Sequence, residues 1–547
     1  MPNHVGSIAR RLMLLLVCTA SVLCACTCDA PTPDAAATPE RGGTLIVALA
    51  QEPESLMPYG TTSAAAEDVK SFLFNMLATT NADFGSFSPE VARAWEWSPD
   101  RKQLLMHLRE DVVWSDGVPL GAEDVAFSYE VARDSLVGWS TRAWKRHVTA
   151  CEVVDRHTVR FQFDTVSFDQ FRFAKEGWLV PKHLLATVPR AEWRKHAFGR
   201  APVGCGPFVL ERWEAGQRIV LVRNEHYFGH PKPWLDRVVF EIVPEASTRV
   251  ERLRAGSVDL VALEPRQAAD LRRDASQGKT QVRVLNVRGR GCDFIGYNPA
   301  DPLFRSRVVR EALTRAIDRR AIIDALCFGF ADIFEGPFAP MLWAYDASHS
   351  PTPYDPEGAK RLLASEGWQD SDGDGWLDRD GHAFEFTLTT NADNALRMQA
   401  IVPVQAYWKA IGVKAEIQAL EMQTALGLRT ERRYQAYFGG WNAGLSPSGT
   451  IESLWSCTSR GGRSNFVDFC NPAVDSLNVL MAAAVSPDAA APFAHRIQAL
   501  IVAEHPYTWL YNEHTLVGIA ARVQGVAADP RGAYVDMDSW SVQETPH

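Results

Sequence analysis

Apolar residues recur at every second position early in the chain and predict a strand. Leu104, Met106 and Leu108 would share one face of an extended segment. A second apolar run covers 112–114, and Asp116-Gly117 soon after it is a strong signal for a hairpin turn. The pattern therefore predicts a pair of strands in this part of the chain.

A helix is expected directly after the strand pair. Its apolar positions lie between Val125 and Val131, and Glu123 and Asp124 would fall in its first turn. Negative charge is favourable there, because the amide end of the helix dipole is positive. Gly121 would take the N-cap position, at a cost of about a few tenths of a kcal/mol relative to a polar cap.

Strand and helix signals alternate along the rest of the chain, which is typical of a mixed α/β protein. A short apolar strand is expected at Leu45–Leu49, and another where Val159, Phe161 and Phe163 alternate. Residues 309–317 and the segment after Asp318 are expected to form consecutive helices, with Asp318 capping the second.

Length and composition limit the architecture and the partners. A chain of 547 residues with 46% apolar residues exceeds what one hydrophobic core usually supports, so two or three lobes are expected. The formal net charge of -10 argues against a nucleic-acid partner, which would require a basic face. Ten cysteines fit an oxidising compartment.

The first 25 residues have the order of a secretory signal peptide. Arg10 and Arg11 precede the apolar run 12–17, which is too short to remain as a spanning helix. Leu23-Cys24-Ala25-Cys26 resembles a bacterial lipobox, which implies cleavage before Cys26 and lipid attachment to it. Secretion without lipid is the alternative. Residues 26–40, rich in Pro, Ala and Thr, would then tether the protein to a membrane on the periplasmic or cell-surface side.

The densest motif lies between Val91 and Glu130. It contains A-x-x-W-x-x-S-x-D from Ala92, W-S-D-G-x-P-L from Trp114 and A-E-D-V from Ala122. Related motifs occur at Glu52–Pro58 and Pro202–Phe208. Together they resemble the bacterial extracellular solute-binding proteins of family 5, the dipeptide- and oligopeptide-binding lipoproteins that supply ABC importers.

The resemblance implies an α/β, periplasmic-binding-protein-like fold. Two lobes would be joined by a hinge, with an extra lobe typical of the peptide-binding branch. Lobe I would comprise 41–75, 206–291 and 506–547. The extra lobe II would comprise 76–205, and lobe III, which closes over the ligand, 292–505.

The resemblance also implies where the ligand lies. The segment Tyr437–Trp441 resembles a strand that enters the cleft of peptide binders, so Trp441 is expected to line the pocket. An Asp three residues later pairs with the peptide's α-amine in such proteins, but this chain has Gly444 there. A buried ammonium without a counter-charge costs several kcal/mol, so a simple amine clamp is not expected. Glu452, the nearest other acid, would either supply the charge or be a solvated surface residue.

Further candidate ligand-binding residues are aromatic or polar: Asn442, Tyr59, Trp343 and Tyr345. The resemblance implies a disulfide between Cys457 and Cys470 that would contribute about 3 kcal/mol by closing a loop. It gives no pairing for the remaining cysteines of the mature chain. Several of them would either form disulfide bonds or be small, buried, unpaired residues. These are Cys28, Cys151, Cys205, Cys292 and Cys327.

One acidic loop has the spacing of a calcium site. Asp370, Asp372, Asp374 and Asp378 are spaced as in a calcium-binding loop, with Gly375 at the turn. Gly381 replaces the bidentate Glu at the last position of such a loop. The loop therefore either binds calcium, which would brace it, or is a solvated turn. No other cofactor is expected.

The expected function is to capture a small solute between two lobes and deliver it to an ABC transporter permease, as a monomer. A peptide is the first expectation for the solute. The alternatives are an oligosaccharide or chelated metal as the solute, or a sensory or adhesive surface lipoprotein without transport. An enzyme is not expected, because the chain has no G-x-S-x-G, H-E-x-x-H or Walker A motif.

Overall fold

The computed structural model describes residues 41–543, apart from 62, 231, 232 and 443. The expected signal peptide, the tether and residues Cys26 and Cys28 therefore lie outside the described residues. In the described part of the chain, no helix combines the length and the apolar character needed to cross a membrane.

A mixed sheet of 12 strands is the main feature of the fold. Its central order is β18-β17-β19-β13-β20-β11-β1-β10-β9-β8, and β12 and β14 also pair with β20. The strands are β1 (Thr44–Leu49), β8 (Phe208–Glu214), β9 (Arg218–Arg223), β10 (Arg237–Ile242), β11 (Leu260–Ala262), β12 (Arg283–Arg288), β13 (Gly291–Tyr297), β14 (Ala331–Asp332), β17 (Glu385–Asn391), β18 (Lys414–Leu420), β19 (Ala436–Asn442) and β20 (Tyr507–Ile519).

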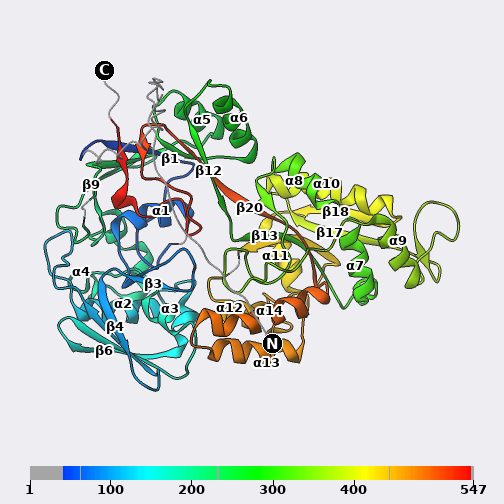
Figure 1. Cartoon of the computed structure of the whole chain (residues 1–547), viewed down its shortest axis with the longest axis horizontal. Coiled ribbons are helices and arrows are strands. Elements are labelled where there is room, and N and C mark those ends of the chain that lie inside the picture. Colours follow the sequence, from blue (N-terminus) through cyan, green and yellow to red (C-terminus); the bar gives the residue numbers. More distant parts are fainter. Residues whose placement is uncertain (1–40, 62, 231–232, 443, 544–547) are drawn as a thin grey trace, which may run out of the picture. The chain divides into compact units, whose positions relative to one another are not determined.

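Strand β20 belongs to both halves of this sheet. Its first residues pair with β13, where Phe294 lies opposite Trp509, and its last residues pair with β11 and β12, where Leu260 and Arg283 lie opposite Ile519. Figure 1 shows β20 in orange-red, extending from the strands near β13 to those near β12. One long strand therefore joins the part of the sheet that contains β1 to the part that contains β19.

A second connection lies beside β20. Strand β12 ends at Arg288 and β13 begins at Gly291, so only two residues separate them. The fully buried side chain of Asn512 on β20 donates hydrogen bonds to the carbonyls of Gly289, at 2.8 Å, and of Gly291. We call residues 289–291 and 512–513 the crossover, and it is where the expected hinge would lie.

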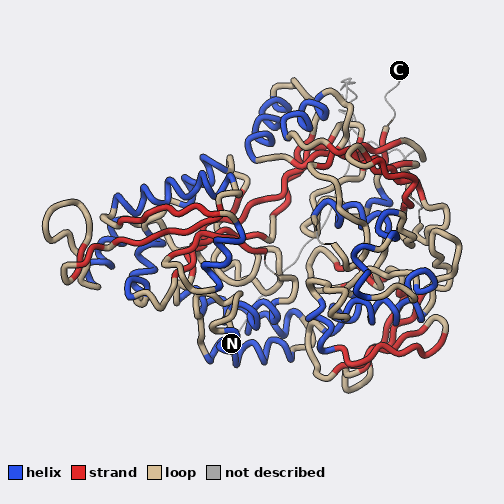
Figure 2. The backbone as a smooth tube through the Cα atoms, turned by 180° about the vertical axis from the view of Figure 1, so that it is seen from behind, coloured by secondary structure: helices blue, strands red, loops and turns tan. Residues whose placement is uncertain are grey.

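Helices flank the large sheet in both of its parts (Figures 1 and 2). Asp318 caps α8 as predicted, because its carboxylate accepts a hydrogen bond from the amide of Ala321 at 2.9 Å. The helices of these two parts are α1 (Ala64–Leu73), α5 (Ala246–Arg254), α6 (Pro265–Ser276), α7 (Arg307–Arg315), α8 (Arg319–Leu326), α9 (Pro356–Ser365), α10 (Ala395–Ala410), α11 (Met422–Thr430), α12 (Pro447–Leu454), α13 (Pro472–Ala483) and α14 (Pro487–Ala503).

A separate antiparallel sheet has the order β4-β5-β7-β6. Its strands are β4 (Ala92–Trp97), β5 (Gln103–Leu108), β6 (Val148–Asp155) and β7 (Thr158–Phe163), and helix α2 (Ala122–Arg133) packs against β6. Two short helices follow, α3 (Gln170–Lys175) and α4 (Lys182–Leu185). Three two-stranded ribbons are also present: β2 (Ala78–Thr80) with β3 (Phe87–Pro89), β15 (Asp378–Arg379) with β16 (His382–Ala383), and β21 (Val523–Gln524) with β22 (Ser541–Val542).

The strand and the helix predicted near residues 104–131 are confirmed, but the strand pairing is different. Strand β5 pairs with β4 and β7. The segments on either side of the Asp116-Gly117 turn form only one isolated bridge, between Val113 and Pro119. Strand β5 forms its hairpin with the preceding β4, and its other edge pairs with β7, about 50 residues further along the chain. Gly121 precedes α2, and its amide donates to the Asp124 carboxylate at 3.0 Å.

The apolar cores follow these sheets. One core surrounds β1, β10 and β11, two others lie in the part that contains β13, β17 and β19, and a fourth fills the space between α2 and the four-stranded sheet. Phe127, Val131 and Trp193, which lie within 76–205, pack into the first core. The segment predicted as the extra lobe therefore shares apolar packing with the first part of the large sheet.

Candidate functional site

Two large cavities lie beside the segment that follows β19. Cavity A has a volume of about 620 Å³ and cavity B of about 680 Å³, both within the range of small-molecule sites. Leu445 lines cavity A, whereas Trp441, Asn442, Gly444 and Ser446 line cavity B. Described residues of this segment therefore contribute to both walls, Leu445 to that of cavity A and the other four to that of cavity B.

Cavity A draws its wall from elements on both sides of the crossover. Leu445 comes from the part of the chain after β13, and Arg290 comes from the crossover itself. The remaining wall residues lie within 71–90, 175–178, 227–230 and 531–538, together with Arg109 and Pro207. A solute in cavity A would touch Leu445, which follows β19, as well as residues on the other side of the crossover.

Most charged groups of cavity A already have partners. Arg109 donates two hydrogen bonds to Asp111, at 2.9 and 2.8 Å, and Arg531 pairs with Asp529 at 2.6 Å. Burial raises the pKa of Glu90, although hydrogen bonds from Asn75 and Thr79 oppose the effect. These groups give the cavity wall a fixed polar lining.

Cavity B brings together three of the predicted ligand-binding residues. Trp441 and Asn442 come from the end of β19, and Gly444 follows them in the loop before α12. The Trp441 ring is partly buried and packs edge-on against Phe294, with 6.1 Å between ring centroids. The rest of the wall comes from α12 with its N-cap Ser446, from α13, from 146–147 and 165–167, and from Phe173 of α3.

The loop around Gly444 is closely packed. A Cβ atom at this position would lie 2.8 Å from the hydroxyl oxygen of Thr450, so any side chain would require Thr450 to move. Glu452, one turn along α12, also lines cavity B and forms an ion pair with Arg146. Both of these side chains are half exposed. The acid nearest to Gly444 in sequence is therefore already paired with a cation.

Asp169 is a buried acid next to cavity B that the sequence did not indicate. Its Oδ2 atom accepts hydrogen bonds from Ser446 at 2.5 Å and from Ser448 at 2.8 Å. The side chain is 2% exposed, and burial raises its pKa against the opposing charge of Arg172. The sequence around Asp169 carries no motif, so only the fold shows that it meets the loop after β19.

Three other predicted pocket residues line neither cavity in the described part of the chain. Tyr59 is buried, and its hydroxyl donates to the carbonyl of Trp178 at 2.5 Å, one layer behind the wall of cavity A. The Trp343 ring packs edge-on against Phe168, with 5.0 Å between centroids, and Tyr345 packs against Phe334. Their proposed contact with a ligand remains a prediction.

The expected bond between Cys457 and Cys470 is present, with an S–S distance of 2.10 Å. It closes a short loop between α12 and α13. Of the cysteines for which the sequence indicated no partner, the four that the structure describes are free: Cys151, Cys205, Cys292 and Cys327.

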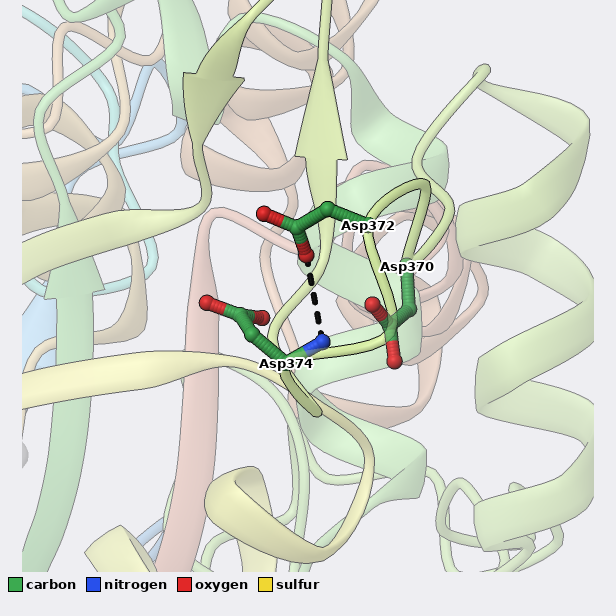
Figure 3. A group of neighbouring side chains, drawn as sticks. All are labelled: Asp370, Asp372 and Asp374. Carbon is green, nitrogen blue, oxygen red and sulfur yellow. Dashed lines mark hydrogen bonds between the residues drawn. The ribbon is translucent and has the colours of Figure 1, made fainter.

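The acidic loop 370–378 lies on the surface (Figure 3). Ligand atoms of Asp370, Asp372 and Asp374 lie within 4.8 Å of one another. Asp370 accepts hydrogen bonds from the amides of Gly373 and Gly375, and Asp372 accepts one from the amide of Asp374. The carboxylate of Asp378 accepts hydrogen bonds from Ser371 instead of joining the other three. Several carboxylate oxygens that could bind a cation therefore already accept hydrogen bonds from backbone amides.

Comparison with known proteins gives one family. Residues 86–462 match the model of the bacterial extracellular solute-binding proteins, family 5 middle. The chain is 26% identical to the oligopeptide-binding protein AppA of Bacillus subtilis over 542 residues, which cover 97% of this chain and 98% of the relative. It is 25% identical to heme-binding protein A of Haemophilus influenzae over 546 residues, which cover 95% and 97%.

Solved structures agree with the fold. The structure of AppA from Bacillus subtilis in complex with a nonapeptide has a TM-score of 0.74 at 25% identity, covering 93% of this chain and 100% of that one. NikA from Brucella suis in complex with Fe(III)-EDTA has a TM-score of 0.79 at 19% identity, covering 92% and 100%. The expected α/β, periplasmic-binding-protein-like fold is thereby confirmed.

The fold and its cavities define an extracellular solute-binding protein. The chain belongs to the bacterial extracellular solute-binding proteins of family 5. It is a transport protein that captures a solute outside the cytoplasm and delivers it to an ABC importer.

Proposed function

We propose that the solute is a peptide and that it occupies cavity A. The observation that carries this proposal is the wall of cavity A, which combines Leu445 and Arg290 with residues of the 531–538 segment. Relatives named for oligopeptide and dipeptide binding match the chain over 97% and 90% of its length. A peptide would use the polar wall for its backbone and the aromatic wall for its side chains.

Capture follows from contacts on both sides of the crossover. A ligand can shift an open–closed equilibrium only by binding one state more tightly than the other. A peptide that touches Leu445 and the 531–538 segment at once makes its full set of contacts only in the closed state. The closed protein is then the form that the permease recognises.

The peptide's α-amine is not clamped by an acid at position 444. Gly444 carries no charge, and Glu452 is neutralised by Arg146. The affinity should therefore depend little on the charge of the amine. Main-chain and side-chain contacts in cavity A would carry the binding energy.

A non-peptide solute is the second candidate. The same Gly444 favours it, because a ligand without an amine needs no carboxylate there. Relatives and neighbours of comparable similarity are a heme-binding protein and a protein solved with Fe(III)-EDTA. In this alternative the solute is an oligosaccharide or a chelated metal.

The protein acts as a lipid-anchored monomer and breaks no bonds in its solute. Acylation of Cys26 would hold it at the membrane, since each buried methylene contributes about 0.8 kcal/mol. A Cys26→Ser variant is expected to move from the membrane fraction to the soluble fraction. Recovery of the solute in chemically unchanged form after binding would support the absence of catalysis.

Native mass spectrometry of the protein purified from its host tests the proposed solute. The expected result is an additional mass that fragments into amino acids. A mass that yields sugars, a porphyrin or a metal chelate would replace the peptide with the second candidate.

A further inference from the structure

We propose that Arg290 binds a carboxylate group of the solute in cavity A. The inference rests on the proposed capture of a solute in this cavity and names the chemical group that the cavity recognises. A peptide always offers such a group at its C-terminus, and an acidic solute of another class would offer one too.

Arg290 is the cation of cavity A that lacks a partner within the described residues. Its side chain lines the cavity, and no described residue forms a hydrogen bond or an ion pair with it. Arg109 and Arg531 in the same wall are each paired with an aspartate. Burial lowers the pKa of Arg290, although the charge of Glu176 opposes the effect. A guanidinium carries five N–H donors and cannot readily shed its charge, so partial burial without an acceptor is costly.

The wall behind Arg290 contains further cations. Arg172 is 1% exposed, and its Nε and Nη1 atoms make no hydrogen bond within the described residues. Lys145 is fully enclosed and donates only to backbone carbonyls, such as that of Phe173 at 2.7 Å, while burial lowers its pKa to about 8. Lys175 pairs with Glu176 at 3.1 Å. These contacts do not supply Arg290 with an anion.

Three carboxylates in this wall have partners other than Arg290. Glu176 pairs with Lys175 and Asp536 with Arg531, whereas Glu90 accepts hydrogen bonds from Asn75 and Thr79. An anionic ligand would give Arg290 the acceptor that these residues do not supply. A carboxylate suits a guanidinium, because its two oxygens match two parallel N–H donors.

The position of Arg290 links the carboxylate to closure. Arg290 lies between Gly289 and Gly291, whose carbonyls both accept hydrogen bonds from Asn512. A carboxylate bound there is attached to the crossover itself, while the rest of the solute contacts the walls on either side. The charged group would thus position the solute across the two parts of the sheet.

The test compares two synthetic pools of random tri- to pentapeptides, one with free C-terminal carboxylates and one with C-terminal amides. Retention of each pool is measured by native mass spectrometry for the wild type and for Arg290→Gln, Arg290→Lys and Arg288→Gln. Arg288 is the matched control, since it lies two residues away, is 61% exposed and pairs with Asp332. Circular dichroism and the thermal midpoint establish that each variant is folded.

We expect the wild type and Arg288→Gln to retain the free-acid pool at least tenfold better than the amide pool. Arg290→Gln should lose this preference, and Arg290→Lys should keep part of it. Equal retention of both pools by the wild type, or an undiminished preference in Arg290→Gln, would overturn the inference.

Failure to retain either pool would instead refute the peptide as solute, and a second measurement then decides the role of Arg290. Calorimetry with citrate and glutarate should show binding to the wild type that Arg290→Gln reduces at least tenfold. Equal binding to the two proteins, or no binding to the wild type, would overturn the carboxylate site as well.

Discussion

The Ser446 hydroxyl donates a 2.5 Å hydrogen bond to the Asp169 carboxylate across 277 residues of sequence. The same oxygen accepts a hydrogen bond from Ser448, and the adjacent amide of Phe168 donates to the carbonyl of Ala482 at 2.9 Å. Asp169 precedes α3, whereas Ser446 caps α12. These bonds therefore fix the loop that separates the two cavities to the segment before α3.

Asp169→Ala is expected to lower the free energy of unfolding by about 3–5 kcal/mol. The substitution leaves the buried Arg172, whose Nε lies 3.9 Å from Asp169, without its counter-charge. Ser448→Ala removes one hydrogen bond from the same oxygen and should cost only about 1 kcal/mol. Urea unfolding of both variants measures the difference, and equal costs would contradict the role assigned to the carboxylate.

Acetylation of the α-amine of a bound peptide should change its Kd by less than about threefold, because no unpaired acid lies at Gly444. Calorimetry with a peptide identified from the host and with its acetylated form makes the measurement. A loss of about a thousandfold, equivalent to about 4 kcal/mol, would show that another acid clamps the amine.

Gly444→Asp tests the same point from the protein side. The new side chain would displace Thr450 and add a carboxylate beside cavity B. The variant is expected to be less stable than the wild type, and a peptide held in cavity A should still bind without distinguishing the free amine from the acetylated one, because Gly444 lines cavity B. Gly444→Asn serves as the control of similar size without the charge, and a preference for the free amine in Gly444→Asp alone would place the amine beside cavity B instead of in cavity A.

The stability of the protein should fall at low pH partly because of Glu335. Burial alone would raise the pKa of this acid, but the His349 imidazole, 3.6 Å away, and the Arg319 guanidinium, 2.7 Å away, lower it from 4.5 to about 2. The resulting stabilisation is present above pH 4.5 and is lost as the pH falls towards 2. It amounts to about 3 kcal/mol.

Glu335→Gln should therefore flatten the acid limb of the stability curve measured by urea unfolding between pH 6 and pH 3, a range of about three units. The exposed Glu357, which pairs with Lys360, provides the control. Glu357→Gln is expected to leave the limb unchanged. Parallel curves for the wild type and Glu335→Gln would mean that Glu335 is not responsible.

Removing the disulfide should destabilise the protein by about 3 kcal/mol, because Cys457 and Cys470 close a loop of 13 residues. The double variant Cys457→Ser/Cys470→Ser measures the loss in urea. Dithiothreitol should lower the midpoint of the wild type but not that of the double variant. An effect of the reductant on both proteins would point to another cause.

Calcium is expected to leave the thermal midpoint unchanged at millimolar concentration. Backbone amides already bind Asp370 and Asp372, and Asp378 is engaged with Ser371. Differential scanning fluorimetry with calcium or with a chelator makes the comparison. A saturable rise in the midpoint that Asp372→Asn abolishes would establish a calcium site.

Local patterns predicted the parts of the fold that depend on neighbouring residues. The strand at 44–49, the helix after Gly121 and the cap at Asp318 all depend on contacts within a few residues. The pairing of β5 with β7 is not predictable in this way, since it joins strands that lie about 50 residues apart in sequence.

The site, like the fold, has features that neighbouring residues determine and features that depend on distant parts of the chain. Trp441, Asn442 and Gly444 line cavity B together, because they lie close in sequence at the end of β19 and in the loop before α12. Their contact with a solute stays a prediction. Asp169 and Arg290 carry no local signal, and their importance comes from what the fold places beside them. Tyr59, Trp343 and Tyr345 were proposed for their aromatic character alone, and the fold uses their rings in packing.

The central claim is that the protein closes around its solute. Small-angle X-ray scattering of the protein freed of its solute, and again after the purified solute is restored, tests this most directly. We expect the radius of gyration to fall when the solute binds and to rise again when it is removed. Superimposable scattering curves, with occupancy shown by native mass spectrometry, would contradict capture by closure.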